Sequence, residues 1–400
     1  MKVLVLGGAG TMGGGGASLL LNYPEVESVV LADINKERVD KFAARLNSPK
    51  VSTIQVDVTD KEKLIEVVKD FDVVLNAVGP FARFGVPILE AVIEAGVNYV
   101  DVCDDHDAAI NLLELDDKAK AAGITALICM GTTPGISNMQ ARYAADQLDS
   151  VDVLKVCWAV GLPSIEKVRG TYLEGIASSS GRDLLSPAAW AHMVHVSTGD
   201  VPIWKNGKWD TMPALEIGEY VDFAEPLGRA ESYYLGHAEP VTLPRYIKIN
   251  DFCACLGSLM PNVTRELRKE ARGHEEPTNP PVKPDTPLWE APEKWKDRGV
   301  WGGQAAIAEG WQKDEYVRYT VRLMMAGITD SRPYNNSGQA IGTYMVGKGL
   351  INKKGVMAPE ACLDPKPFFE ELAKYYTQYT GEKFTPEEVI LVDREVIKKK

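Results

Sequence analysis

The stretch Met1–Gly16, MKVLVLGGAGTMGGGG, determines how the rest of the chain can be arranged. Lys2–Leu6 is a short run of Val and Leu, which is typical of a buried parallel strand. A G-x-G-x-x-G sequence follows directly, and Ala17–Leu21 is predicted to lie in the helix after it. A strand, a glycine-rich turn and a helix in this order begin a βαβ unit, so we predict an α/β protein with a doubly wound parallel sheet.

Each glycine of this turn has a mechanical role. Gly8 permits the tight turn, Gly10 lets a pyrophosphate approach bare backbone, and Gly13 lets the helix pack closely on the strand. The helix N-terminus adds N–H groups and a positive dipole end. Glycine-rich turns also occur in ordinary α/β proteins, so the motif needs a supporting context.

An acidic residue about twenty positions further on supplies that context. Val29–Asp33 is a second apolar run that ends in Asp33. A carboxylate there accepts hydrogen bonds from the ribose hydroxyls and repels a 2′-phosphate. We therefore expect the cofactor to be NAD, while the nearby cations Lys36 and Arg38 leave NADP open.

Later strand ends extend the predicted cofactor site. Asp57 follows a third strand and is expected beside the adenine, unless it caps the helix that begins near Lys61. Asp72–Val78 is a fourth strand, and the loop after it is expected at the nicotinamide. The predicted cofactor-binding residues are Gly8, Gly10, Thr11, Met12, Gly13, Asp33, Ile34, Asp57, Val58, Ala77, Val78 and Gly79.

Composition excludes several classes of protein. The chain has 400 residues and a formal net charge of −12, which argues against a nucleic-acid-binding protein. No apolar run approaches the length of a membrane span, so we expect no membrane partner. The chain opens on a core strand, and we expect neither a signal nor a transit peptide. Six scattered cysteines suit a reducing cytoplasm.

Cys253 and Cys255 are the only closely spaced cysteines. Neither a second pair nor a His cluster accompanies them in the sequence, so we expect buried thiols and no metal site.

The length predicts two domains. Strand-like and helix-like segments alternate as far as about Gly131, and we place a dinucleotide-binding domain at 1–137. Strand-like runs without regular helical crossovers predict a mixed sheet within 138–335, and the pattern is helical again over 336–400.

Within the predicted mixed-sheet domain, Asn206-Gly207 is a hairpin signal. The Pro-rich segment 274–302, with Trp289 and Trp295, is predicted to be an ordered insertion.

The segment Tyr99–His106 holds the candidate catalytic chemistry. It places three carboxylates, a thiol and an imidazole close together. Crowded carboxylates raise each other's pKa and can bind a substrate ammonium. We predict catalytic roles for Cys103 and Asp104 and substrate binding by Asp105, with helix capping by Asp105 or Asp107 as the alternative.

The order of several motifs resembles the saccharopine dehydrogenase family, in its saccharopine reductase and lysine dehydrogenase branch. The matching stretches, which together cover nearly the whole chain, are the N-terminal glycine motif, Asn76–Phe81, Gly96–Asp101, Gly131–Gly135, Gly161–Pro163, Ser178–Arg182 and Gly355–Glu360. The resemblance implies a Rossmann domain to which the C-terminal helices return, with a substrate-binding and dimerisation domain between. A homodimer is therefore expected.

The resemblance also implies roles for single residues. Arg182 matches an arginine that binds a substrate carboxylate, a task for which a planar guanidinium is suited, although a surface salt bridge is the alternative. Thr133 stands where saccharopine reductases carry an aspartate that touches the substrate, which puts saccharopine itself in doubt. Phe81 is expected near the substrate, and His237 is a candidate acid or base unless it is structural.

The predicted function follows from these expectations. We expect an NAD(P)-dependent oxidoreductase that acts on the C–N bond of an amino acid or amine, with hydride passing between nicotinamide and a nitrogen-bearing carbon. One alternative is an opine-type or carboxynorspermidine-type reductive condensation. A second is a dinucleotide-binding sensor or assembly protein without catalysis.

Overall fold

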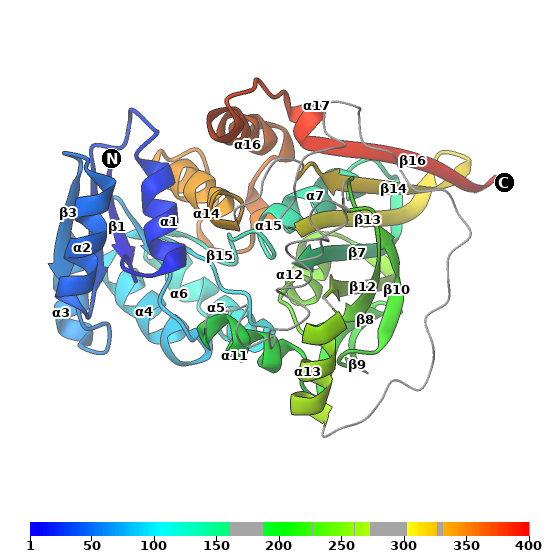
Figure 1. Ribbon diagram of the computed structural model, residues 1–400, viewed down its shortest axis with the longest axis horizontal. Coiled ribbons are helices and arrows are strands. Elements are labelled where there is room, and N and C mark those ends of the chain that lie inside the picture. The colour runs from blue at the N-terminus through cyan, green and yellow to red at the C-terminus, as the bar shows by residue number, and fades with distance from the viewer. Residues whose placement is uncertain (161–186, 226, 260, 273–301, 326–330, 400) are drawn as a thin grey trace. The chain divides into compact units, whose positions relative to one another are not determined.

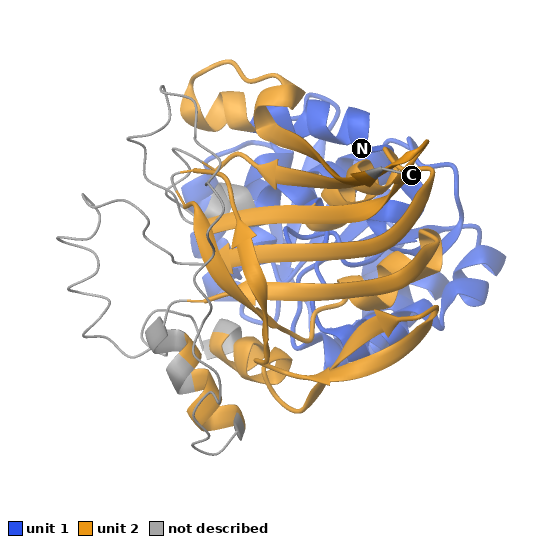
Figure 2. Ribbon diagram, turned by 90° about the vertical axis from the view of Figure 1, so that its right-hand side faces the viewer, with its two compact units in different colours: residues 1–136, 332–375 blue, residues 137–331, 376–400 orange. Residues whose placement is uncertain are grey.

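The computed structural model describes residues 1–400 except 161–186, 226, 260, 273–301, 326–330 and 400. The chain forms two compact units (Figure 2), and each is discontinuous in sequence. Unit 1 contains residues 1–136 and 332–375, and unit 2 contains residues 137–331 and 376–400. Arg182, Trp289, Trp295 and the Pro-rich insertion lie outside the described residues.

Unit 1 is built on a seven-stranded parallel sheet in the order β15-β6-β5-β4-β1-β2-β3. Figure 1 labels β1, β3 and β15 of this sheet. The strands are β1 (Lys2–Leu6), β2 (Ser28–Asp33), β3 (Val51–Gln55), β4 (Val73–Asn76), β5 (Asn98–Asp101), β6 (Thr125–Leu127) and β15 (Gly355–Met357). The strand order reverses between β1 and β4, and ligands of such sheets bind at the carboxyl ends of the strands beside this point. The predicted doubly wound fold is confirmed.

Helices connect these strands, and residues next to the helix ends in the sequence cap several of them. They are α1 (Thr11–Leu20), α2 (Lys36–Leu46), α3 (Lys61–Val68), α4 (Phe81–Ala95), α5 (His106–Leu113), α6 (Asp116–Ala121), α14 (Ser331–Gly347), α15 (Pro359–Cys362) and the first part of α16 (Pro365–Thr380). Asn35 and Asp60 cap α2 and α3 with their side chains. Gly96 ends α4 at a φ of 72°, which favours glycine.

Unit 2 contains a mixed nine-stranded sheet, as predicted. Seven strands follow the order β10-β11-β12-β7-β13-β14-β16, while β8 pairs with β12 and β9. The strands are β7 (Ser150–Val160), β8 (Asp200–Lys205), β9 (Lys208–Pro213), β10 (Ile217–Asp222), β11 (Arg229–Tyr234), β12 (Ile249–Ser258), β13 (Gly302–Gln312), β14 (Glu315–Leu323) and β16 (Ile390–Lys399). The helices are α7 (Ile136–Ala145), α11 (Pro187–Val196), α12 (Glu239–Tyr246), α13 (Pro261–Arg272), the end of α16 and α17 (Pro386–Val389).

The predicted hairpin is confirmed at β8 and β9. Trp204 pairs with Trp209, and Asn206 and Gly207 between them have φ values of 52° and 77°. Positive φ at both central positions is the requirement of a type I′ turn. The sequence signal and the backbone therefore agree residue by residue.

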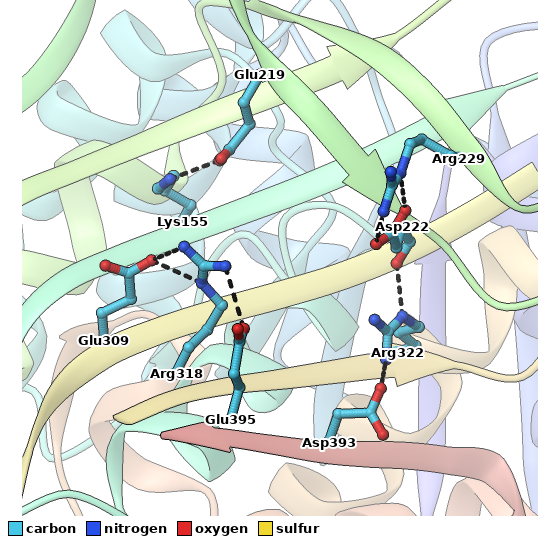
Figure 3. A network of polar contacts seen from close by, with 9 residues as sticks. All are labelled: Lys155, Glu219, Asp222, Arg229, Glu309, Arg318, Arg322, Asp393 and Glu395. Carbon is cyan, nitrogen blue, oxygen red and sulfur yellow. Dashed lines mark hydrogen bonds and ion pairs between the residues drawn. The ribbon is translucent and has the colours of Figure 1, made fainter. Parts of the chain in front are cut away.

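A network of ion pairs ties the strands of unit 2 together (Figure 3). Arg318 of β14 binds Glu309 of β13 and Glu395 of β16, and Lys155 of β7 binds Glu219 of β10. The second branch runs through Arg322, which is 5% exposed and donates to Asp393 and to the carbonyl of Asp222. Because buried charges need compensation, the pairs that Arg318 and Arg322 make with Glu309, Glu395 and Asp393 stabilise the pairing of β14 with β13 and β16.

The fold corrects the expectation for the C-terminal segment. Residues 332–375 belong to unit 1, but residues 376–400 belong to unit 2. Ile390–Lys399 is strand β16 and pairs antiparallel with β14, so the expected return of helices over all of 336–400 is wrong for its last part. Alternating residues of β14 such as Val317 and Val321 are fully buried, and β16 covers the open edge of that strand.

Two smaller expectations concern the whole chain. Cys253 and Cys255 are buried, as predicted. Among the described helices, none combines the length and the apolar character that crossing a membrane requires.

Candidate functional site

The glycine-rich loop joins β1 to α1 with close backbone contacts. Gly7 has a positive φ of 75°, so the tight turn depends on Gly7. The prediction that Gly8 permits this turn is therefore wrong. A Cβ on Gly8 would lie 2.8 Å from the Cβ of Leu31 in β2, and a Cβ on Gly13 would lie 2.4 Å from the carbonyl oxygen of Gly7. Glycine is therefore required at Gly8 for contact with β2 and at Gly13 for contact between helix and loop.

The N-terminus of α1 fits an anionic group. Gly10 is the N-cap residue and contributes no capping side chain, and the first turn holds no acidic residue. The N–H groups of Thr11, Met12 and Gly13 precede any helical carbonyl that they could bind. Such a helix end offers donors and positive potential to a phosphate, as predicted for these residues.

Asp33 at the end of β2 lies next to this loop. Its Oδ2 accepts a hydrogen bond from Ala9 N at 3.2 Å, and its Oδ1 accepts one from Asn35 N at 3.0 Å. The contact with Ala9 brings the predicted acidic residue to the glycine loop. Lys36 donates to Asp40 and Thr53, so its charge is already engaged on α2 and β3.

The residues predicted to lie beside the adenine are Ile34, Asp57 and Val58. Ile34 is 63% exposed, which leaves an apolar surface beside Asp33. Asp57 is not a helix cap: its Oδ1 accepts from Thr59 N and Oγ1, which lowers the pKa of its carboxyl, and Asp60 caps α3 instead. The cofactor roles of Ile34, Asp57 and Val58 remain predictions.

The loop after β4 also reaches the glycine loop. Asn76 Oδ1 accepts from Val78 N at 3.0 Å, which holds the loop against the strand end. A Cβ on Gly7 would lie 2.9 Å from the carbonyl oxygen of Ala77, so these two loops touch. Nothing lies within 4 Å of a Cβ placed on Gly79. The structure thus brings the predicted contacts Ala77, Val78 and Gly79 to one edge with the phosphate loop.

Phe81 occupies a different environment from the one predicted. It is the first residue of α4 and only 7% exposed, and its ring lies 3.5 Å from a Cβ placed on Gly85 in the same helix. A side chain that packs inside unit 1 is poorly placed to contact a substrate. Thr133 is half-buried in the loop that follows β6, and its substrate role remains a prediction.

A buried polar network lies at the ends of β4 and β5. Asn76 Nδ2 donates to the hydroxyl of Tyr99 at 2.9 Å, and Asp101 Oδ1 accepts from the backbone N–H groups of Cys103 and Cys129 at 3.0 and 2.8 Å. Burial raises the pKa of Asp101 to about 6 despite those hydrogen bonds. The sequence prediction did not assign a role to Asp101, although an acidic residue at the end of an apolar strand was a usable signal.

Cys103 does not fit the predicted catalytic role. Its side chain is fully buried, and burial raises the pKa of its thiol well above the ordinary value. The reactive form of cysteine is the thiolate, so a buried thiol of this kind is a poor nucleophile or acid-base group. Asp104 is partly exposed, and Asp105 occupies the N-cap position of α5 but makes no capping hydrogen bond with its side chain. The substrate and capping roles expected for this segment remain predictions.

His237 lies in unit 2 and is 3% exposed. Its ring centroid is 5.2 Å from that of Trp158, and its Nε2 lies 3.4 Å from Nε2 of His192. Its Nδ1 lies 3.5 Å from Oε2 of the fully buried Glu239. The predicted acid-base role of His237 remains a prediction.

Comparison with known proteins identifies the relationship. Residues 3–127 match the model of the saccharopine dehydrogenase NADP binding domain. The resemblance to the saccharopine dehydrogenase family is confirmed. The match contains the glycine loop, Asp33 and the loop after β4, so the predicted nicotinamide dinucleotide cofactor is supported at the level of NAD or NADP.

Curated relatives match longer parts of the chain. A carboxyaminopropylagmatine dehydrogenase from Synechocystis sp. is 27% identical over 255 residues, 62% of this chain and 59% of the relative. A carboxynorspermidine synthase from Vibrio cholerae is 27% identical over 217 residues, 50% of this chain and 47% of the relative. The aligned part of the chain thus spans about half the length of these relatives.

A solved structure supports the same fold over the whole chain. The saccharopine dehydrogenase (L-Glu forming) from Saccharomyces cerevisiae superposes with a TM-score of 0.63 at 17% sequence identity. The match covers 99% of this chain and 100% of the yeast chain, so both the parallel and the mixed sheet belong to this fold.

Proposed function

We propose that the protein is an NAD(P)-dependent oxidoreductase that acts on the C–N bond of an amino acid or amine. The observation that supports this most directly is the family match over residues 3–127, which covers the described dinucleotide site. Both relatives reported above carry names of carboxylated amines, and one is named a dehydrogenase. A carboxylated amine as substrate suits these names and the predicted carboxylate anchor.

Different residues of the chain bind the cofactor and the substrate. The N-terminus of α1 binds the pyrophosphate, and Asp33 binds the ribose and favours NAD over NADP. The nicotinamide ring supplies the hydride donor or acceptor when bound. Arg182 anchors the substrate carboxylate, Asp104 and Asp105 attract an ammonium group, and Thr133 is a further substrate contact.

A reductive condensation is the second candidate. In this reaction an amine and a carbonyl compound first form an imine, whose C=N bond is then reduced. The name of the Vibrio cholerae relative, a carboxynorspermidine synthase, favours it. The two candidates share the hydride step and differ in whether one or two organic substrates are needed.

A substrate screen tests the proposal. The full-length protein is incubated with NAD or NADP and a panel of amino acids and polyamines, and nucleotide reduction is followed optically. The reverse direction uses NADH or NADPH with amine and aldehyde pairs. Turnover with one amine supports the first candidate, and turnover that requires a pair supports the second. Tight dinucleotide binding without turnover in the whole panel favours a sensor or assembly protein.

The setting of this activity is also part of the proposal. We expect a homodimer in the cytoplasm with a small-molecule substrate and without a nucleic-acid partner. The acidic charge of −12 supports the last point, because phosphate backbones repel an acidic surface.

A further inference from the structure

Three side chains of different chemistry meet inside unit 2. His237 precedes α12, Glu239 begins that helix, and Cys255 lies in the middle of β12. A ring nitrogen, a carboxylate oxygen and a sulfur atom from these residues all lie within 4.8 Å of one another. The residues are 3%, 0% and 1% exposed, so the cluster is closed to bulk water.

The spacing within the cluster is unusual for a hydrogen-bonded pair. His237 Nδ1 and Glu239 Oε2 are 3.5 Å apart, and His237 Nδ1 makes no hydrogen bond. Strong hydrogen bonds between charged groups are shorter, roughly 2.7–2.9 Å. Two ligands that each lie about 2.0–2.1 Å from a tetrahedral ion are separated by about 3.3 Å, which is close to the observed distance.

Neighbouring polar groups orient the two side chains. Ser137 Oγ donates to Glu239 Oε1 at 3.0 Å, which leaves Oε2 directed to His237. On the other edge of the imidazole, His237 Nε2 lies 3.4 Å from His192 Nε2. A metal on Nδ1 requires the proton on Nε2, and His192 is placed to accept it. Ligating histidines generally donate their second ring N–H in this way.

The surroundings of Cys255 are apolar. Its cluster includes Trp158, Val196 and Leu235, all buried. A divalent ion here has both a low-dielectric shell and charged ligands, which is the usual condition of a tight site.

We propose, in place of the metal-free thiol expected from the sequence, that His237, Glu239 and Cys255 bind one tetrahedral Zn²⁺ ion. Its fourth ligand is a single water molecule enclosed with the ion. Nitrogen, oxygen and sulfur together suit zinc, whereas calcium and magnesium take oxygen ligands. Binding replaces the S–H bond of Cys255 by an S–Zn bond and releases one proton to solvent. The ion connects the start of α12 to β12 and thereby stabilises unit 2.

Direct metal measurements test this proposal. The full-length protein is stripped with a chelator, and zinc affinity is measured by competition with a chromophoric chelator. We expect one tightly bound Zn²⁺ per chain. Because zinc displaces the thiol proton of Cys255, affinity is expected to rise with pH. Replacement by Co²⁺ is expected to give a thiolate-to-cobalt charge-transfer band.

Variants distinguish this site from adventitious binding. Cys255→Ser removes the sulfur ligand and abolishes the charge-transfer band, and Ser137→Ala weakens zinc binding by about 10- to 100-fold through the oriented carboxylate. Cys157→Ser is the matched control, because Cys157 is equally buried but belongs to the apolar cluster on the other face of the sheet. It is expected to keep both the band and the affinity.

Two results would overturn the proposal. One is a wild-type protein that keeps no zinc at stoichiometric concentration. The other is a cobalt spectrum without sulfur ligation, which needs no variant and therefore does not depend on whether Cys255→Ser folds. Metal binding is measured without turnover, so failure here leaves the proposed oxidoreductase activity untouched.

Discussion

Asp33 is the residue whose surroundings bear most directly on cofactor choice. Its carboxylate faces the glycine loop through Ala9 N, while the neighbouring Lys36 is engaged by Asp40 and Thr53. We therefore expect NADH to bind more tightly than NADPH. Asp33→Ala is expected to lower the dissociation constant of NADPH relative to that of NADH by roughly fivefold, because the substitution removes about 1 kcal/mol of repulsion between the carboxylate and the 2′-phosphate.

Fluorescence titration with both nucleotides measures this ratio. Glu66→Gln is the control, because it removes an exposed carboxylate on α3 without touching the site. Tighter binding of NADPH by the wild type would show that the predicted preference is wrong.

Asp101 leads to a prediction about pH. The pKa of its carboxyl is raised to about 6, compared with about 3.9 in an unfolded chain. The folded state therefore holds a proton that the unfolded state has lost, and the stability from this group decreases as pH rises from about 4 to about 6. The change is on the order of 3 kcal/mol and levels off above pH 7.

Chemical denaturation of wild type and Asp101→Asn at several pH values measures this effect. Asparagine keeps an acceptor for the N–H groups of Cys103 and Cys129 but does not titrate. The wild type should lose stability relative to the variant between pH 4 and pH 6. A difference that is constant across this window would contradict a raised pKa.

Arg182 carries the prediction about the substrate. If it anchors a carboxylate, Arg182→Ala should lower kcat/KM by roughly ten- to two-hundredfold, which corresponds to a charge-assisted contact of about 1.5–3 kcal/mol. Arg182→Lys should restore only part, because an ammonium cannot make the paired contact. The melting temperature and NAD affinity should be unchanged. An equal loss with an amine that lacks a carboxylate would exclude the anchoring role.

For single residues, the sequence predicts those roles that a local motif requires. Asp33 and Gly13 could be assigned because a G-x-G-x-x-G turn requires them at fixed spacing. The burial of Cys103 could not be predicted, because it depends on how tightly β5 and β6 pack. The meeting of His237 and Cys255 depends on the pairing of distant segments, which no local pattern records.

Among the elements, α1 shows why a helix holds four consecutive glycines, Gly13–Gly16, directly after its first two residues. A Cβ on Gly14 would lie 2.5 Å from the ring of Phe42, and one on Gly15 would lie 2.2 Å from Asn336 Nδ2. Gln339 of α14 also donates to the carbonyl of Met12 at 2.8 Å. The run therefore serves helix packing as well as the phosphate loop, and the second purpose was not predicted because α14 lies more than 300 residues away.

Gly15→Ala tests this packing. Alanine favours helix by about 1 kcal/mol over glycine, but overpacking costs about 1–3 kcal/mol, so we expect net destabilisation. Gly85→Ala in α4 is the matched control, because its Cβ would meet neighbours at ordinary distances of 3.5–3.7 Å. We expect it to be neutral or stabilising. Denaturant unfolding compares the free energies of unfolding of the two variants. Equal effects would show that the Asn336 side chain moves away from the new methyl group without loss of stability.

For the whole molecule, we expect the predicted homodimer to form through β16. This strand is an edge of the unit 2 sheet, and its Val392, Val396 and Ile397 are 40%, 38% and 44% exposed. Exposed aliphatic residues on an edge strand favour pairing with another chain. We expect light scattering at micromolar concentration to give the mass of a dimer, and Val396→Lys to shift it towards the monomer.

Glu387→Gln is the control for the added charge, since it also raises the net charge by one unit and Glu387 is exposed on α17, outside β16. A wild-type monomer at that concentration would refute the predicted dimer.

At the same scale the sequence predicted two sheets of the correct kinds, because strand and helix periodicity is a local property. The assignment of β16 to the second sheet was missed. Its charged residues Asp393, Arg394 and Glu395 pair with Arg322, Glu315 and Arg318 on β14, more than 70 positions earlier in the chain, which no local pattern records.

The interleaved division of the chain has a consequence for its synthesis. Unit 1 lacks α14 and β15 until residue 357 has emerged, and the sheet of unit 2 lacks β16 until residue 399 has emerged. A ribosome adding roughly 5–20 residues per second would leave the glycine face of α1 uncovered for about 10–40 seconds after that helix and its sheet have formed. Nascent chains halted near residue 330 should therefore recruit chaperones and resist proteolysis poorly. Chains whose residue 399 has emerged can complete both cores.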